Sequence, residues 1–130
     1  MAQKSPFQFR LDPTTGVPAY RQVIDQVTLA IATGALSGGD QLPTVRQVAV
    51  DLAINPNTVV RAYRELEIKG TLSTQQGVGT FVTPGSVKPD EAQREKRLSQ
   101  LAAECAAKAG AEGFRIEELV ERLRELFERS

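Results

Sequence analysis

The stretch that most constrains this chain is residues 42–70, LPTVRQVAVDLAINPNTVVRAYRELEIKG. It predicts two short helices joined by a tight turn. The first helix is expected to start at Thr44, because TVRQ matches a capping box. In that motif the threonine oxygen accepts from a backbone N–H three residues on, and Gln47 reaches back to the start of the helix. The residues expected to face inward from this helix are Val45, Val48, Ala49 and Leu52.

The second helix is expected over residues 57–69. Asn55 suits its N-cap, and Pro56 suits the first helical position, where a proline loses no hydrogen bond. Gly70 is expected to close it. At about 100° per residue, one face carries Val59, Ala62, Tyr63 and Leu66, and the opposite face carries Asn57, Arg61 and Arg64 with Val60 beside them. Such a helix buries one side and presents the other.

The segments on either side complete a small domain. Residues 18–33 predict a helix whose apolar stripe is Tyr20, Val23, Ile24, Val27 and Ile31, with Gly34 at its exit. Residues 7–11 alternate apolar and polar, which predicts a short strand that seals the edge of the core. Residues 71–75 and 80–83 predict a β-hairpin around the turn QGVG.

Three helices followed by a hairpin predict a mostly helical α+β fold, the winged helix-turn-helix. We expect this domain over residues 12–84, with the helix-turn-helix at 44–69 and the wing at 71–83. Proline and glycine then mark a boundary near residues 84–89.

The tail, residues 90–129, predicts two further helices, 90–108 and 114–128, separated by the break GAEG. A unit of this size rarely sustains its own core, so its apolar stripes must pack on the first domain or on another copy. We favour another copy, which makes the tail a dimerisation unit. Cys105 is expected to be a small core residue. The candidate dimerisation residues are Leu98, Leu101, Cys105, Ile116, Leu119, Val120, Leu123, Leu126 and Phe127.

Charge and composition narrow the function. The 16 basic and 16 acidic residues cancel, which counts against a bulk polyanion binder, so any nucleic-acid surface must be local. Residues 52–64 supply such a patch, with two arginines and no acid. One cysteine and no histidine exclude a disulfide framework and a Cys/His zinc site, and no catalytic constellation appears, so we expect no enzyme and no cofactor. There is no long apolar run and no signal sequence, which predicts a cytoplasmic protein without a membrane partner.

The outer face of the second helix predicts contact with double-stranded DNA. A helix fits the major groove, where Asn57 can pair with adenine and Arg61 can contact guanine or a phosphate. Thr58 can bond a phosphate or cap the helix, and Arg64 lies at the margin. The alternatives are a plain three-helix core with a solvated face and a winged module that binds proteins. The wing-tip glycines precede no helix, so a dinucleotide loop is disfavoured against a wing tip or a simple turn.

Residues 42–70 together with QQGVGTFV resemble the GntR family of bacterial transcription regulators, and PAYRQVIDQV and the short helical tail are similar to its YtrA subfamily. The resemblance covers residues 12–83. It implies a dimeric DNA-binding repressor with a near-palindromic operator; a small-molecule effector stays open. Many relatives carry arginines where Pro56 and Val60 stand, which leaves two expectations: Arg61 takes over part of that contact, or the base readout of this chain differs. The family's contact positions carry over to Arg46, Asn55, Asn57, Thr58, Gln76 and Gly77, and the full candidate set adds Thr44, Arg61 and Arg64.

Overall fold

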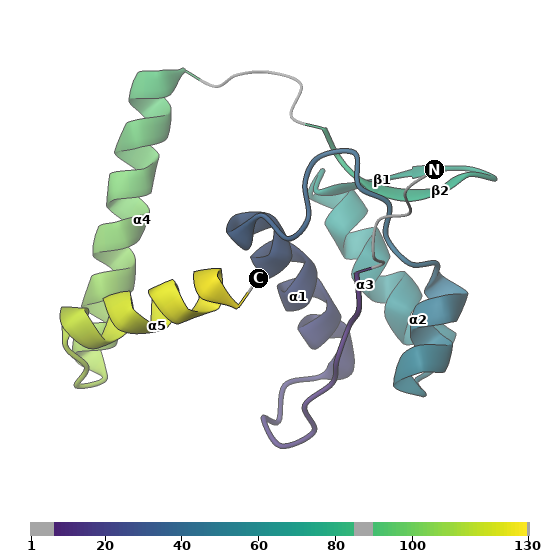
Figure 1. The fold of residues 1–130 in the computed structure, drawn as a ribbon, viewed down its shortest axis with the longest axis horizontal. Helices are drawn as coiled ribbons and strands as arrows, with labels where there is room; N and C mark the ends of the chain where they lie inside the picture. The colour runs from purple at the N-terminus through teal and green to yellow at the C-terminus, as the bar shows by residue number, and fades with distance from the viewer. Residues whose placement is uncertain (1–6, 85–89, 130) are drawn as a thin grey trace. The chain divides into compact units, whose positions relative to one another are not determined.

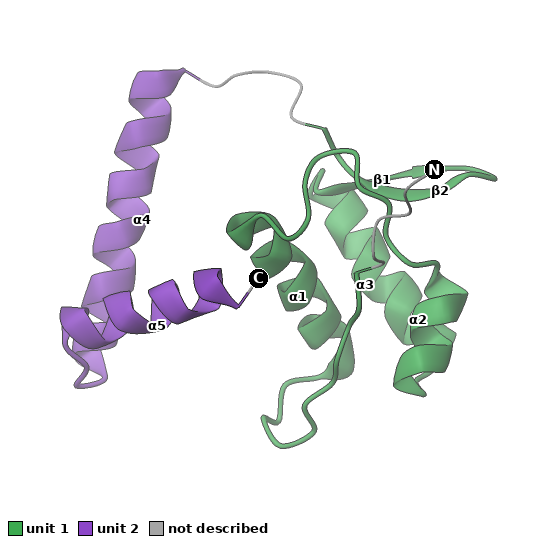
Figure 2. Cartoon of the chain, viewed as in Figure 1, with its two compact units in different colours: residues 1–84 green, residues 85–130 purple. Residues whose placement is uncertain are grey.

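The computed structural model describes residues 7–84 and 90–129, and the chain divides into two compact units, residues 1–84 and 85–130 (Figure 2). The first unit contains three helices and a two-stranded sheet, and the second contains two helices (Figure 1). This confirms the predicted winged helix-turn-helix. Within the described ranges, no helix is long and apolar enough to cross a membrane.

Helix α1 spans Ala19–Thr33, one residue shorter than predicted because Pro18 is its N-cap. It ends where predicted: Gly34 has a φ of 88°, a left-handed conformation that glycine adopts without a steric penalty. Its buried face consists of Val23, Ile24, Val27 and Ala30. Tyr20 and Ile31 of the predicted stripe are half-buried against the same core.

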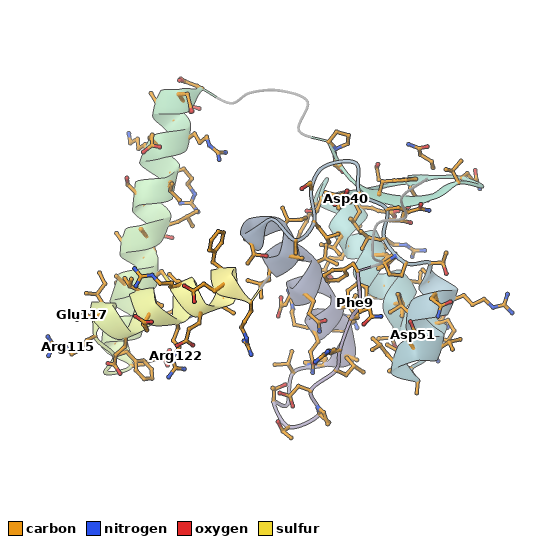
Figure 3. All side chains as sticks on the ribbon, viewed as in Figure 1. Phe9, Asp40, Asp51, Arg115, Glu117 and Arg122 are labelled. Carbon is orange, nitrogen blue, oxygen red and sulfur yellow. The ribbon has the colours of Figure 1, made fainter. Side chains whose placement is uncertain are left out.

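Helices α2 (Val45–Leu52) and α3 (Pro56–Ile68) form the predicted pair. The Thr44 hydroxyl oxygen accepts from the backbone N–H of Gln47 at 3.0 Å, as predicted. The return half of the capping box was wrong, because the Gln47 amide donates to the Asp51 carboxylate at 2.7 Å (Asp51 is labelled in Figure 3). A carboxylate one turn along the helix is a charged acceptor, and that bond holds the side chain away from the helix start.

The wing consists of antiparallel strands β1 (Leu72–Gln75) and β2 (Gly79–Val82), paired from Leu72 with Val82 to Gln75 with Gly79. The loop before α2 also pairs with β2, through an isolated bridge between Gln41 and Phe81. This pairing was not predicted. It ties the wing to the segment that leads directly into the helix pair.

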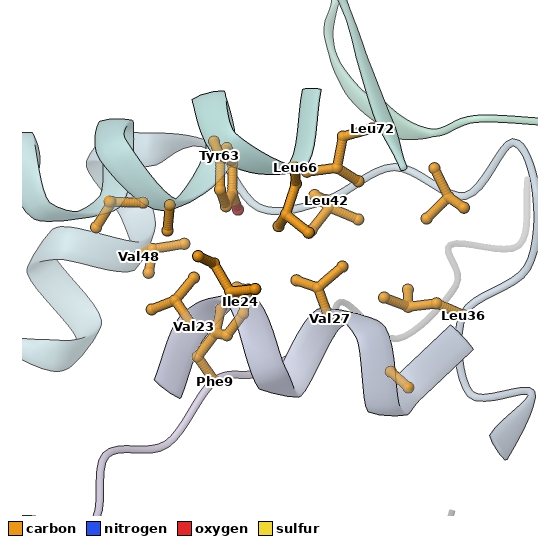
Figure 4. Packing of buried hydrophobic residues seen from close by; sticks show 14 of the residues in the cluster. Phe9, Val23, Ile24, Val27, Leu36, Leu42, Val48, Tyr63, Leu66 and Leu72 are labelled. Carbon is orange, nitrogen blue, oxygen red and sulfur yellow. The ribbon is translucent and has the colours of Figure 1, made fainter. Parts of the chain in front are cut away.

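One apolar core holds α1, α2, α3 and the wing together (Figure 4). The largest fully buried side chains are Ile24, Leu66, Val23, Val27, Val48 and Val59. The four residues predicted for the inner face of the third helix, Val59, Ala62, Tyr63 and Leu66, are all buried. This face fixes which side of α3 is left for a partner.

The N-terminal arm forms no strand, so the prediction for residues 7–11 was wrong. Phe9 is nevertheless buried in the core, with Phe7 packed against its ring. The side chain of Gln26 satisfies the backbone of Arg10, accepting from its N–H at 2.9 Å and donating to its carbonyl oxygen. A glutamine from α1 therefore takes the place of a neighbouring strand.

The second unit is a helical hairpin of α4 (Glu91–Ala111) and α5 (Ile116–Glu128). The predicted break at Gly110 was too early, because α4 continues through it and the chain turns at Gly113, whose φ is 89°. Neither helix has a buried residue. Cys105 is exposed in the single chain, so its predicted place in a core is wrong for one copy.

Candidate nucleic-acid interface

The outer face of α3 brings three predicted contact residues together. Asn57, Arg61 and Arg64 are exposed and line one surface groove of about 450 Å³. Val60, Glu65 and Ile68 complete the lining of this groove. Thr58 is half-buried at the first turn. The groove therefore offers amide and guanidinium groups along the face that is opposite to the core.

The two N-cap residues use their side-chain oxygens inside the protein. Asn55 accepts from the backbone N–H of Asn57 at 2.8 Å, and Thr44 caps α2 in the same way. Each keeps a donor, the Asn55 amide N–H and the Thr44 hydroxyl hydrogen, that a phosphate oxygen can accept. The helix N-termini add the partial positive charge of their free backbone N–H groups. These residues suit phosphate better than base edges.

The arginines around the helix pair differ from the ion-paired basic residues of the first unit in having no acidic partner among the described residues. In residues 7–84, the described ion pairs occupy Arg21 and Lys69, which bind Asp25 and Glu65. The exposed guanidinium groups of Arg46, Arg61 and Arg64 form no ion pair with any described residue, while Asp51 accepts from Gln47. Three guanidinium groups around the helix pair therefore have no acidic partner among the described residues, and they are available to an anion.

Arg61 has a neighbour that the periodicity did not reveal. Its guanidinium carbon lies over the ring of Tyr20 in α1, 3.7 Å from the ring centroid, which is a cation–π contact. We assigned Tyr20 only to an apolar stripe. An exposed arginine on one helix and a half-buried tyrosine on another gave no local signal of this contact, because only the packing of α1 against α3 brings them together.

The wing tip presents Gln76 and Gly77, both exposed. Gly77 has a φ of 79° with open space where a side chain would be, so only backbone conformation requires glycine there. Gly79 is different: a Cβ there would collide with the side-chain amide nitrogen of Gln41. That nitrogen donates to the carbonyl oxygen of Val78 at 3.3 Å. Gln41 therefore holds the wing tip, a role that sequence reasoning missed.

The comparisons with known proteins agree with this geometry. Residues 19–82, from the first residue of α1 to the last of β2, match the model for bacterial regulatory proteins of the gntR family. The chain is 35% identical over 121 residues to the HTH-type transcriptional repressor YtrA of Bacillus subtilis strain 168, and the match covers 90% of both chains. The chain belongs to the GntR family. This confirms the resemblance stated above and sets aside the protein-binding alternative, so the chain is a sequence-specific DNA-binding transcription regulator.

Solved structures resemble this GntR protein along most of its length. A transcriptional antiterminator from Listeria monocytogenes EGD-e matches with a TM-score of 0.69 at 25% identity, covering 95% of each chain. The DNA-binding domain of AraR, solved in complex with operator ORE1, matches with a TM-score of 0.50 at 28% identity. That match covers 59% of this chain and 94% of the AraR chain. A chain with the fold of the first unit has therefore been captured on operator DNA.

Proposed function

We propose that this GntR protein is a homodimeric repressor that binds a near-palindromic operator in double-stranded DNA. The observation that carries the proposal is the outer face of α3, where Asn57, Arg61 and Arg64 are exposed and the arginines have no described acidic partner. Repression is favoured by the likeness to YtrA of Bacillus subtilis, which is named a repressor. A repressor of this kind acts by occupying a site that overlaps a promoter.

The docking mode follows from which face of α3 is free. Its N-terminal half enters the major groove, where the Asn57 amide can pair with an adenine edge and Arg64 can reach a base or the backbone. Thr44, Arg46, Asn55 and Thr58 surround that entry with donors for phosphate. The wing tip, Gln76 and Gly77, lies against the adjacent minor groove or a phosphate.

The two units divide the work. Residues 12–84 bind DNA, with the helix-turn-helix at 44–69 and the wing at 71–83, and residues 90–129 dimerise. The apolar face of α5 supports this division. Only its edge residues Leu119 and Leu126 are half-buried in the single chain, whereas Ile116, Val120, Leu123 and Phe127 are between 45% and 66% exposed.

A second copy is the occupant that best suits this face. On α4, Leu98 and Leu101 are 58% and 45% exposed, and Cys105 is also exposed. Large apolar side chains that are exposed at helical spacing on one face are typical of a surface that a partner covers. Two copies would bury it and would place two α3 helices on successive turns of the major groove, about 34 Å apart. Each α3 alone carries little charge, so pairing supplies the affinity that one copy lacks.

We infer that the protein works in the cytoplasm, where bacterial DNA lies, and that it acts by binding rather than by catalysis. No cofactor is assigned to it. Its proposed partner is double-stranded DNA.

Fluorescence anisotropy with the full-length protein and a labelled random-sequence duplex tests the interface. We expect binding at low salt. The logarithm of the binding constant should fall linearly with the logarithm of the salt concentration, since each phosphate contact releases counterions. Arg46→Ala should weaken binding and reduce that slope by about one per protomer. Arg94→Ala removes an equal charge from α4 and should change neither the affinity nor the salt slope. Wild-type protein that does not bind, or Arg46→Ala protein that binds as wild type does, would contradict the proposed interface.

A further inference from the structure

The arginines on the outer face of α3 differ in their surroundings. Arg61 lies over the ring of Tyr20, with its guanidinium carbon 3.7 Å from the ring centroid, whereas Arg64 lies over no aromatic ring of the described residues. A ring beneath a guanidinium covers one side of it and leaves N–H donors free. Within residues 7–84 and 90–129, no acceptor takes up those donors of Arg61. The guanidinium of Arg61 is therefore held in place by the ring, while its N–H groups have no hydrogen-bond acceptor among the described residues.

This cation–π contact lies on the flank of α3 that faces α1. One turn beyond Arg61, Glu65 pairs with Arg21 of α1 at 3.9 Å, which marks the same flank. On a helical wheel, Asn57 and Arg64 lie within about 20° of each other, and Arg61 lies about 40° from Asn57 toward this flank. When α3 docks on DNA, Asn57 and Arg64 therefore point into the DNA groove, and Arg61 points toward the edge of that DNA groove.

Tyr20 is suited to hold a neighbour in place. It is half-buried and packs against the core of the first unit, so its ring is fixed to α1. A guanidinium held over that ring cannot at the same time extend its full length toward the base edges at the floor of a DNA groove. A phosphate at the edge of the groove is the DNA group that such a side chain meets. Because the arginine is already ordered, binding costs it less rotamer freedom.

We propose that Arg61 is a phosphate contact, not a base contact, and that Tyr20 of α1 is the positioning residue that aims its guanidinium at the DNA backbone. The inference rests on the proposed function, since it assumes that α3 docks on DNA. Arg61 then adds affinity and salt dependence without sequence preference, and the base reading passes to Asn57 and its neighbours at the start of α3.

The test measures the affinity of full-length variants for two duplexes of equal length: a random sequence, and an operator selected by the wild-type protein from a random pool. Arg61→Ala should weaken binding to both by the same factor and lower the salt slope by about one per protomer, leaving their ratio unchanged. Loss of affinity for the operator alone would mean that Arg61 reads a base, and would overturn the proposal.

A double-mutant cycle tests the positioning role. Tyr20→Leu should weaken binding to both duplexes about two- to fivefold, the range expected for an exposed cation–π contact. Tyr20→Phe keeps the ring and should restore most of that loss. In the Arg61→Ala background, Tyr20→Leu should have no further effect, whereas in the Arg64→Ala background it should retain its full effect. Additive losses in the Arg61→Ala background would overturn the positioning role.

The readouts separate the possible failures. If the Arg61→Ala protein loses thermal stability, Arg61→Lys replaces it, because lysine retains the charge on an exposed side chain but lacks the planar guanidinium. In that background Tyr20→Leu should weaken binding less than it does in the wild type, because an ammonium is held over the ring less firmly than a planar guanidinium, and an undiminished loss would count against the proposal. Wild-type protein that binds neither duplex at low salt would refute the proposed function and this inference with it. Binding by the wild type with additive Tyr20 and Arg61 losses would refute this inference alone.

Discussion

The hydroxyl of Tyr63 donates a 2.6 Å hydrogen bond to the carbonyl oxygen of Pro43. Tyr63 lies in the middle of α3, and Pro43 precedes Thr44, the cap of α2. One bond therefore links the helix proposed to enter the groove with the segment that carries the proposed phosphate contacts. The ring of Tyr63 is buried in the core, so this bond stands at the junction of core and interface.

Tyr63→Phe removes the donor and leaves the Pro43 oxygen without that partner. We expect the free energy of unfolding to fall by about 1 kcal/mol, the usual net value of such a bond. Tyr20→Phe is the matched control, since the Tyr20 hydroxyl forms no hydrogen bond with the described residues, and it should change stability by less than about 0.5 kcal/mol. Urea unfolding followed by tyrosine fluorescence measures both, because the chain has no tryptophan and its two tyrosines lie in the first unit. Equal stability of the two variants would contradict this role.

The same residue makes stability depend on alkaline pH. Burial raises the pKa of the Tyr63 hydroxyl above its ordinary value of 10.0. At a pH between 10 and the raised pKa, the folded state keeps the Tyr63 proton that the unfolded state has released. The stabilisation is therefore complete below pH 10 and is lost as the pH rises through the raised pKa. The wild-type advantage over Tyr63→Phe should therefore shrink above pH 10, by up to about 1.4 kcal/mol per pH unit. An advantage that stays constant would show that Tyr63 is not held neutral by burial.

Asn55 and Asn57 should separate stability from binding. Asn55 caps α3, so Asn55→Ala should destabilise the protein by about 1 kcal/mol. Asn57 is exposed, and Asn57→Ala should change stability by less than about 0.5 kcal/mol while weakening operator binding. Asn55→Asp preserves the cap but adds a negative charge beside the proposed phosphate contacts, so it should remain stable and bind DNA less well. Thermal unfolding and anisotropy on the same samples would show the split, and parallel losses in every variant would argue against it.

Ala53 has a φ of 56°, and it is the one non-glycine residue with positive φ in the described chain. It ends α2 in a left-handed conformation that costs an L-residue energy. Ala53→Gly should raise the free energy of unfolding by about 0.5–1 kcal/mol, because relief of strain exceeds the added chain entropy. Ala53→Val, with a branched side chain at the same φ, should lower it by about 1 kcal/mol or more. Destabilisation by glycine would mean that the turn is not strained.

The dimer is tested by placing one lysine on either side of α5. Leu123 is 51% exposed on the apolar face, and Leu123→Lys should raise the dimer dissociation constant by at least about a hundredfold, because the loss is counted on both copies. Glu121 lies on the polar face, and its one ion pair among the described residues is the exposed pair with Arg124, so Glu121→Lys should leave the dimer intact. Sedimentation velocity distinguishes the two. A Leu123→Lys protein that sediments as the wild type does would exclude this face as the interface.

The helix pair was predictable because its signals are local. The Thr44 cap and the Asn55–Pro56 start lie within a few residues of the bonds they make, and the inner face of α3 repeats at the helical period. The exposed contact residues followed from the same period. The family resemblance added Arg46 and the wing tip, which no pattern of spacing singles out.

The structural features that were wrongly predicted or missed depend on contacts between segments that are far apart in the sequence. The alternation at residues 7–11 resembled a strand, but Gln26 of α1 satisfies part of that backbone. The helical period assigned Tyr20 to the core, but its contact with Arg61 arises only from the packing of α1 against α3. Gln41 reaches the wing from a loop far back in the chain. Cys105 was assigned to a core that a single copy does not form. Hydrophobic periodicity predicts which face of a helix is buried, but it does not predict which residue a polar or aromatic side chain contacts.

In the proposed complex, two copies present two α3 helices to one symmetric site. Selection of bound sequences from a random DNA pool by the full-length protein measures this symmetry. We predict an enriched near-palindrome whose half-sites are centred about one helical turn, roughly 10 base pairs, apart. An enriched single half-site without a symmetry mate, or a pool that shows no enrichment, would contradict it.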